Sequence, residues 1–435
     1  MDKATELFQT ARQYIAGGVS SSTRLNKALD RPFYISRGDG GLVYDLDGRP
    51  YVDLCTSHGA SLLGHNHPKI KAAIQSVLDL GIICSYENEY HTKLAQKITQ
   101  VVPSAELVRF VGSGTEATMY ALKIARGYTG KEKFIRFEGH FHGYHDYASW
   151  SYAPPADQEP VDGELKPYRQ SDGIPEGIGQ YAIVTQFGDL AALEKVVKKH
   201  KDEAAAIICE PIHYNCGCIV PDKEYMKAMR QLATDNGIVL IYDEVLSAFR
   251  MGPGGAQEYL GVTPDLCTIG KCVGGGLPLS VIAGKREIMS VLRPTGNTEH
   301  SGTYNGHILN VAAGLAAVTE MTSPGFYEKI YHIADRFYPG FEGIIERSGV
   351  KARIQYLGAR FGIYFGIDTP VRSYRDAIKS DKDMMLKFIA EANKRGVYFH
   401  DYGGKAAHHG FSWAHTDADI DRALEGIEGA LKALR

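Results

Sequence analysis

Between residues 107 and 270, short apolar runs alternate with amphipathic segments, and this alternation limits the folds that the chain can adopt. The apolar runs lie at 107–112, 133–139, 204–211, 237–244 and 266–270, and helical patterns cover 115–130, 189–200 and 223–237. Continuous apolar runs of this length, separated by helices, are typical of parallel strands buried on both faces. The sequence therefore predicts a layered α/β fold built on a parallel sheet.

The length and charge of the chain narrow the choice further. A chain of 435 residues is longer than one small core usually organises, so we expect a large domain with a smaller one. The formal net charge of −3 gives no electrostatic reason to expect nucleic acid or an anionic membrane as a partner. No apolar run approaches the roughly 20 residues that span a bilayer, and the first residues lack a secretory h-region. We expect a cytoplasmic protein.

The cysteines and histidines match no familiar metal or disulfide pattern. Seven cysteines, an odd number, are scattered along the chain, and the tight pair Cys216 and Cys218 lacks a second half-site. The stretches HGASLLGHNHP and KAAHHGF are rich in histidine but lack the spacing of a helical metal site. We expect reduced thiols and no bound metal.

Residues able to do chemistry follow the predicted strands, at the sheet edge where ligands of α/β proteins bind. Ser113, Gly114 and Thr115 precede a helix, so they form either a phosphate cradle or a plain helix N-cap. The next strand ends provide an aromatic ring, an imidazole, carboxylates and a lysine; they are Phe141, His142, Glu210, Asp243 and Lys271.

Lys271 is the most unusual of these residues, because lysine is seldom placed directly after a buried strand. The ligand that uses a lysine, a buried carboxylate, an aromatic face and a phosphate loop together is pyridoxal 5′-phosphate. A lysine forms a Schiff base with its aldehyde, and a carboxylate keeps its ring nitrogen protonated. Burial would lower the pKa of Lys271 and favour the free amine that must attack.

Three segments also resemble a known family, the class III aminotransferases of fold type I. They are DEVLSAFRMGPGGAQEYLGVTPDLCTIGKCVGGG around Lys271, VGSGTEATMYALKIAR at the phosphate loop and FEGHFHGYHD at the ring-stacking loop. The likeness covers nearly the whole chain. It implies a large domain with a mostly parallel seven-stranded sheet between helices, expected over 61–310. It also implies a smaller α+β domain made from the N- and C-terminal parts, 1–60 and 311–435.

The resemblance assigns roles to individual residues. It implies Lys271 as the Schiff-base and proton-transfer residue and Asp243 as the partner of the pyridinium nitrogen. The expected cofactor-binding residues are Ser113, Gly114, Thr115, Phe141, His142, Glu210, Val245 and Thr303. Thr303 would reach the phosphate of the neighbouring subunit, which implies a homodimer with shared sites. Arg250 is expected to support the fold through an ion pair.

Within the family, the chain is most similar to glutamate-1-semialdehyde aminomutase and to aminotransferases for D-phenylglycine and β-amino acids. Arg24 matches a position associated with the substrate carboxylate, and a guanidinium suits a carboxylate. Two departures concern the substrate site. The segment 144–170, which overlaps an unusually long polar stretch at 153–179, replaces the small-residue gate of the aminomutase, and SHGA at 57–60 replaces its tryptophan-bearing segment. Trp150 and Tyr152 would form an aromatic substrate wall or pack the loop.

These features predict an aminotransferase that moves an amino group from an amino acid, aromatic or β-amino, to a keto acid by a ping-pong cycle. The alternative is an intramolecular aminomutase of the glutamate-1-semialdehyde type, which uses the same residues without an external keto acid. An amine transaminase or an epimerase is a more distant alternative. A non-catalytic pyridoxal-phosphate-binding regulator is disfavoured, because Lys271 is present and no segment is left for a DNA-binding module.

Overall fold

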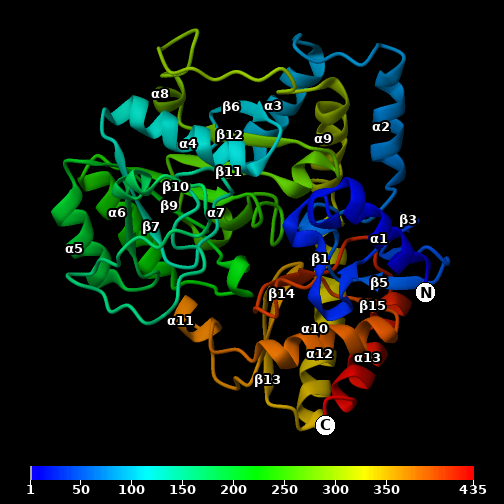
Figure 1. Cartoon of the computed structure of the whole chain (residues 1–435). Coiled ribbons are helices and arrows are strands. Elements are labelled where there is room, and N and C mark those ends of the chain that lie inside the picture. The colour runs from blue at the N-terminus through cyan, green and yellow to red at the C-terminus, as the bar shows by residue number, and fades with distance from the viewer. Residues whose placement is uncertain (1) are drawn as a thin grey trace.

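The computed structural model describes residues 2–435, and a seven-stranded sheet forms the centre of its larger part (Figure 1). In spatial order the strands are β6 (Leu107–Val111), β12 (Ser280–Gly284), β11 (Leu266–Ile269), β10 (Val239–Glu244), β9 (Ala204–Cys209), β7 (Lys133–Phe137) and β8 (Ala182–Thr185). Only β12 is antiparallel to its neighbours. The mostly parallel sheet is confirmed, and the five predicted apolar runs are five of its strands.

Both faces of this sheet are covered by helices, as continuous apolar strands require. On β10, Val239 and Ile241 pack in one core cluster with α4 (Gly114–Thr129). Leu240 and Tyr242 point to the opposite face and pack with α5 (Leu190–His200) and α6 (Lys223–Asp235). Each helix begins at a side-chain cap, Ser113, Asp189 or Asp222, which accepts a free N–H of the first turn. The predicted α/β class is confirmed.

The smaller part of the molecule combines the two ends of the chain (Figure 1). One sheet contains β3 (Arg37–Asp39), β4 (Leu42–Tyr44), β5 (Pro50–Asp53) and β15 (Val397–Tyr398), and β15 runs parallel to β5. A second sheet contains β13 (Ala352–Leu357), β14 (Arg360–Phe365) and β16 (His408–Gly410). The long helices beside them are α10 (Phe326–Ser348), α12 (Lys382–Lys394) and α13 (Asp417–Lys432). N- and C-terminal segments therefore depend on each other for their sheet hydrogen bonds.

The remaining elements connect or border these two parts. They are α1 (Lys3–Tyr14), the short pair β1 (Leu25–Asn26) and β2 (Arg31–Pro32), α2 (Pro68–Leu78), α3 (Glu89–Val101), α7 (Gly255–Leu260), α8 (Arg286–Met289), α9 (Ile308–Met321) and α11 (Tyr374–Ala377). Helix α9 packs against α2 and α3 and extends across the expected boundary at 310, so the exact domain limits stay a prediction. No helix within residues 2–435 is both long enough and apolar enough to cross a membrane.

Candidate active site

The carboxyl ends of the parallel strands meet at one cavity of about 300 Å³. Its lining includes nine of the residues expected at the site, namely Ser113, Gly114, Thr115, Phe141, His142, Glu210, Asp243, Val245 and Lys271. They come from the ends of five strands and the segments that follow them, and they are brought together because parallel strands end at the same sheet edge. The structure thus collects these residues as expected, while their individual roles remain predictions.

At one side of this cavity lies the N-terminus of α4, where an anion would be stabilised by free N–H groups and the helix dipole. The hydroxyl of Ser113 accepts the N–H of Glu116 at 3.2 Å and donates to its carboxylate at 2.8 Å. Ser113 is therefore an N-cap, one of the two alternatives open from the sequence, and capping still leaves earlier N–H groups free.

Gly143 lies beside Thr115 with φ +98°, and an added Cβ would come within 2.8 Å of the Thr115 Cα. Glycine there lets the 139–143 loop approach the helix end.

Asp243 is the most firmly held group in the cavity. Its Oδ2 accepts a hydrogen bond from His142 Nδ1 at 2.8 Å, and its Oδ1 accepts one from Thr268 at 3.0 Å and one from the Val245 N–H at 3.2 Å. Burial lowers the pKa of His142 although Asp243 opposes the shift, so the imidazole is neutral and donates from Nδ1. The carboxylate is thereby held in one orientation in the cavity.

Glu210 carries a carboxyl group of different character. Burial raises its pKa to about 8, and the nearby Asp243 adds to the shift. The N–H of Phe141 and the amide of Asn215 bond to the two oxygens at 2.8 and 2.9 Å and partly oppose it. Near neutral pH this group is largely protonated and can donate a hydrogen bond to a ligand.

Lys271 follows β11 directly and lies between the 300 Å³ cavity and a larger one. Loss of hydration lowers its pKa to about 8, against the attraction of Asp243. Arg250 and Arg360 act in the same direction as burial. Its φ of 51° is rare for a residue with a side chain, and such conformations concentrate at functional sites. Lys271 can therefore be a neutral amine near physiological pH.

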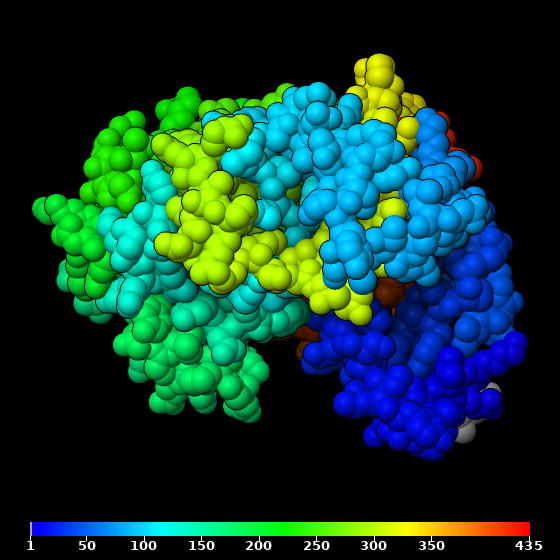
Figure 2. All heavy atoms as spheres, turned by 90° about the horizontal axis from the view of Figure 1, so that it is seen from above, coloured from blue at the N-terminus to red at the C-terminus, as the bar shows by residue number. Residues whose placement is uncertain are grey.

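The larger cavity, of about 680 Å³, shares Phe141, Asn215 and Lys271 with the first. One wall comes from Tyr152 and from four residues of the long polar segment 153–179, namely Ala153, Pro154, Pro155 and Tyr168. The opposite wall comes from Thr23, His58 and the C-terminal residues Tyr374 to His408. In Figure 2 a hollow separates the blue N-terminal segment from the green segment, with C-terminal atoms behind it. Among residues 2–435 no acidic side chain lines this cavity, but Lys382 and Lys405 do.

Three expected site residues do not line either cavity of this chain. Arg24 is exposed on a short turn, although its neighbour Thr23 reaches the larger cavity. Trp150 is 4% exposed and packs with Ile174 in the core, so the structure favours its role in packing the loop over a role in the substrate wall. Tyr152, in contrast, lines the larger cavity. Thr303 is exposed beside a separate surface hollow.

The predicted ion pair of Arg250 is wrong. This guanidinium is 1% exposed and donates to two backbone carbonyls, that of Leu246 at 2.8 Å and that of Gly59. It supports the fold by joining the loop after β10 to a segment of the smaller part. A buried carbonyl needs a hydrogen-bond donor, and the Arg250 guanidinium supplies one to Gly59 without any acid.

Several site residues escaped the sequence analysis. Thr268 could have been found, since it is the parallel-strand partner of Asp243 and points to the same face. Asn215, beside Glu210, follows the same strand and gave only a weak signal. Tyr402 and Lys405 come from the smaller part and line the larger cavity, and Arg360 of the same part lies near enough to lower the pKa of Lys271; only the tertiary fold brings them there.

The residues of the smaller cavity fit pyridoxal 5′-phosphate. His142 Nε2 is buried without a protein partner, and Asp243 keeps lone pairs free for a ring N–H. Phe141 and Val245 both line the cavity and offer apolar surface to a flat ring, and the α4 N-terminus suits a phosphate. A fold with a mostly parallel seven-stranded sheet and a lysine at this edge defines a pyridoxal-phosphate-dependent transferase of fold type I.

The chain belongs to the class III aminotransferases, whose family model matches residues 25–431. It is 38% identical to a protein of Methanosarcina acetivorans named glutamate-1-semialdehyde 2,1-aminomutase, over 98% of this chain and 97% of the relative. Among solved structures, it resembles an omega-transaminase from Sphaerobacter thermophilus with a TM-score of 0.93 and 30% identity, over 100% of this chain and 98% of the other. A β-phenylalanine aminotransferase from Variovorax paradoxus gives 0.84 and 27%, over 98% and 92%.

These findings establish a pyridoxal-phosphate-dependent enzyme of the aminotransferase class and its cofactor. They also bear on the finer prediction. The names of the curated relatives support the intramolecular aminomutase better than the leading hypothesis of transfer between two substrates.

Proposed function

We propose that this enzyme shifts an amino group within one substrate, as the name glutamate-1-semialdehyde 2,1-aminomutase describes for its curated relatives. The support is the 38% identity over nearly the full length of both chains. In the structure, the observation that supports amino-group chemistry is the position of Lys271, which lines both cavities.

The residues of the chain would divide the work. Asp243 would hold the ring nitrogen of the cofactor, and the α4 N-terminus would hold its phosphate. When bound, pyridoxal 5′-phosphate supplies an electron-withdrawing ring. Lys271, with a pKa of about 8, can take up and release a proton at neutral pH, as a general acid–base group must. Protonated Glu210 would donate a hydrogen bond at the base of the cavity.

The larger cavity suits a substrate that carries a carboxylate, as glutamate-1-semialdehyde does. Lys382 and Lys405 line it, no acidic side chain does, and neither lysine has an ion-pair partner within residues 2–435. Arg24, the residue expected for this role from the sequence, remains a second candidate near the cavity entrance. The KM values of Lys405→Ala and Arg24→Ala distinguish the two residues. The variant that lacks the carboxylate contact should show the higher KM, because a desolvated charged contact contributes about 2–5 kcal/mol.

A second function, transfer from an amino-acid donor to a separate keto acid, is favoured by the wall of the larger cavity. Tyr374 donates to the carbonyl of Pro154 at 2.5 Å and fixes the segment that replaces the gate of the aminomutase. An aminomutase must retain its intermediate, whereas an aminotransferase must release a product and admit another substrate. The similarity to an omega-transaminase agrees with this second function.

One experiment separates the two functions. The pyridoxamine-loaded enzyme is mixed with excess glutamate-1-semialdehyde without a keto acid, and the isomer with its amino group on carbon 1 is quantified. Many turnovers per site support the aminomutase. One equivalent per site of the diamine with amino groups on carbons 1 and 2 in place of the isomer, with more diamine formed only when an amino donor is added, supports the aminotransferase. No product under either condition contradicts the proposed substrate.

We further propose a cytoplasmic homodimer in which Thr303 contacts the cofactor phosphate of the partner. The carbonyl of Thr303 accepts hydrogen bonds from Ser85, which holds it beside the 80–86 segment. Apolar side chains are exposed there and next to Thr303; they are Leu80, Ile82, Tyr86 and Tyr304. Exposed apolar surface of this kind marks protein contacts. A monomer at micromolar concentration in sedimentation analysis would contradict this assembly.

A further inference from the structure

The turn after β5 is strained. Thr56, Ser57 and His58 have φ values of 50°, 54° and 54°, so three consecutive residues with side chains adopt the left-handed conformation. Each costs roughly 1–2 kcal/mol relative to the right-handed form. Such strain persists only where the surrounding structure enforces it, and it concentrates at functional sites. The turn is also part of the SHGA stretch, where the sequence departs from the aminomutases.

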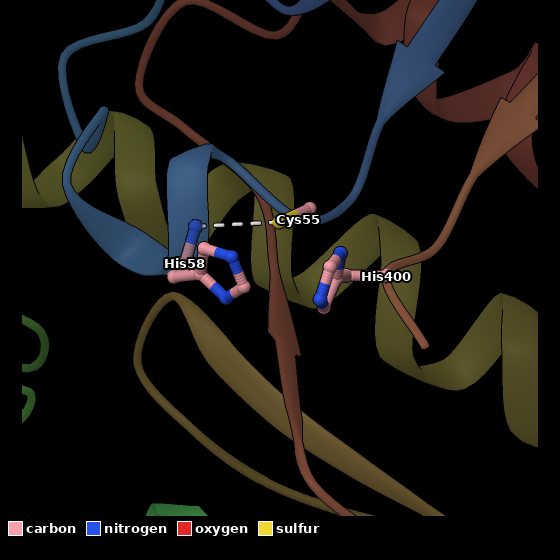
Figure 3. A group of neighbouring side chains, drawn as sticks. All are labelled: Cys55, His58 and His400. Carbon is pink, nitrogen blue, oxygen red and sulfur yellow. Dashed lines mark hydrogen bonds between the residues drawn. The ribbon is translucent and has the colours of Figure 1, made fainter. Parts of the chain in front are cut away.

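This turn places a thiol and an imidazole beside a second imidazole. One ligand atom from each of Cys55, His58 and His400 lies within 4.8 Å of the other two. Figure 3 shows the His58 N–H donating to the Cys55 sulfur, at 3.2 Å, and the ring of His400 approaching from the segment after β15. Zn–S and Zn–N bonds of about 2.3 and 2.0–2.1 Å place tetrahedral ligand atoms about 3.5 Å apart. Small rotations of the three side chains would bring their ligand atoms to this spacing.

Each imidazole has one ring nitrogen that a cation could take. His400 Nε2 must donate to the Thr23 carbonyl at 2.7 Å, because a carbonyl only accepts, so the lone pair on Nδ1 accepts from the Tyr398 hydroxyl at 3.1 Å, a bond that a cation would displace. His58 Nδ1 bonds to the Tyr402 hydroxyl at 2.9 Å, which leaves Nε2 for a ligand. Each ring also has an outer partner on its other nitrogen, as metal-bound histidines do: the Thr23 carbonyl for His400 and the Tyr402 hydroxyl for His58.

The charges around the cluster determine which cation it can accept. Arg360 and Lys271 oppose positive charge at His58, whereas Asp53 favours it. A cation must therefore gain its stability from the Cys55 sulfur. Cys55 is buried, so only a metal that binds thiolate strongly would displace its proton. Zn²⁺ and Co²⁺ do so, while Mg²⁺ and Ca²⁺ prefer oxygen ligands.

We propose that Cys55, His58 and His400 bind one thiophilic divalent cation, such as Zn²⁺, in the wall of the larger cavity. The cation takes the Cys55 thiolate and one nitrogen of each histidine, and one proton passes from the thiol to solvent. Because His58 lines the cavity, the fourth coordination position opens towards the substrate. Three protein ligands with one open position is the arrangement of an accessible zinc site rather than a purely structural one.

The test uses the cofactor-loaded enzyme and Co²⁺ alone as a probe. Tetrahedral Co²⁺ bound to thiolate gives intense visible d–d bands at longer wavelengths than the cofactor absorbs. We expect these bands to saturate at one Co²⁺ per chain, to disappear on adding Zn²⁺, and to be unaffected by Mg²⁺. Absence of the bands, or weak bands of octahedral Co²⁺ at surface histidines, would overturn the proposal.

Variants assign the bands to the three residues. Cys55→Ser and His400→Gln should each weaken Co²⁺ binding by at least about 100-fold, since losing a ligand costs more than losing an outer partner. Cys84→Ser is the matched control, because Cys84 lies outside the cluster, and it should bind like the parent enzyme. If Cys55→Ser fails to fold, His58→Gln at its half-buried position replaces it. Unchanged binding in any folded ligand variant refutes the site. The experiment measures metal binding, so its result does not depend on the proposed amino shift.

Discussion

Replacing Asp243 by asparagine tests the base of the cofactor cavity most directly. The side chain keeps its shape, and one oxygen can still accept from Thr268 and from the Val245 N–H. The other oxygen becomes an amide that faces His142 Nδ1, and two donors then meet at a distance of 2.8 Å in the parent enzyme. His142 can relieve this conflict by moving its proton to Nε2, which is buried without a protein partner. The substitution therefore alters protonation rather than packing.

The structure sets two magnitudes for Asp243→Asn. A buried donor without a partner costs about 1–3 kcal/mol, and we expect a loss of unfolding free energy in that range. The effect on rate is larger, because a neutral amide cannot hold a charged ring nitrogen, and a desolvated charged contact contributes about 2–5 kcal/mol. With about 1.4 kcal/mol per tenfold, kcat/KM should fall about 30- to 4,000-fold.

The assay follows a single turnover of the cofactor-loaded enzyme by the change in cofactor absorbance. Thr268→Val is the matched control, since it removes one hydrogen bond to Asp243 but leaves the carboxylate. A neutral hydrogen bond contributes about 0.5–1.5 kcal/mol, so this variant should lose about 2- to 12-fold. If fully loaded Asp243→Asn turns over within about threefold of the parent enzyme, the carboxylate does not govern the cofactor and our reasoning fails.

Four further predictions follow from the same site. Lys271→Ala should still bind the cofactor but lose borohydride-stable attachment and almost all turnover; attachment at another lysine would contradict the assignment. The pKa of Glu210 is raised from 4.5 to about 8, so in the apoenzyme this group makes the free energy of unfolding fall as pH rises through that range. Glu210→Gln should therefore make the free energy of urea unfolding less dependent on pH between pH 5 and 8. Gly143→Ala places a side chain against Thr115 at a φ of +98°, so it should lower both Tm and cofactor affinity. Gly173→Ala is its control: Gly173 has a similar φ of +84°, but an added Cβ there meets no atom within 4 Å, so Tm should change only slightly. Thr303→Ala should weaken cofactor binding at concentrations where the protein is dimeric, and unchanged affinity would remove Thr303 from the partner's site.

The sequence revealed those parts of the site that depend on local pattern. Lys271 and Asp243 follow apolar strands, and the direction of parallel strands brings their ends together without knowledge of any other contact. The helix beginning at Ser113 and the turn at Gly143 also have local signals. These features were predicted because each is determined within a few residues.

The substrate side was predicted less well, because it depends on packing between distant segments. Trp150 gave the same pattern as a cavity-lining aromatic residue, and only the packed core shows that its ring contacts Gly179 rather than a cavity. The partners of Arg250 are carbonyls, which any residue supplies, so no acid in the sequence could have marked them. Tyr402 and Lys405 reach the cavity only through the pairing of β15 with β5.

The pairing of the two chain ends also affects when the enzyme becomes active during its synthesis. The sheet that carries Asp243 and Lys271 is complete once residue 284 has emerged, but β15 and the cavity wall up to His408 are made afterwards. At about 5–20 residues per second, a nascent chain would hold a formed cofactor sheet for roughly 6 to 25 s before its substrate cavity could close. During that interval β5 has no β15 to pair with. A chain released early would thus resemble a cofactor-binding protein that has no substrate cavity.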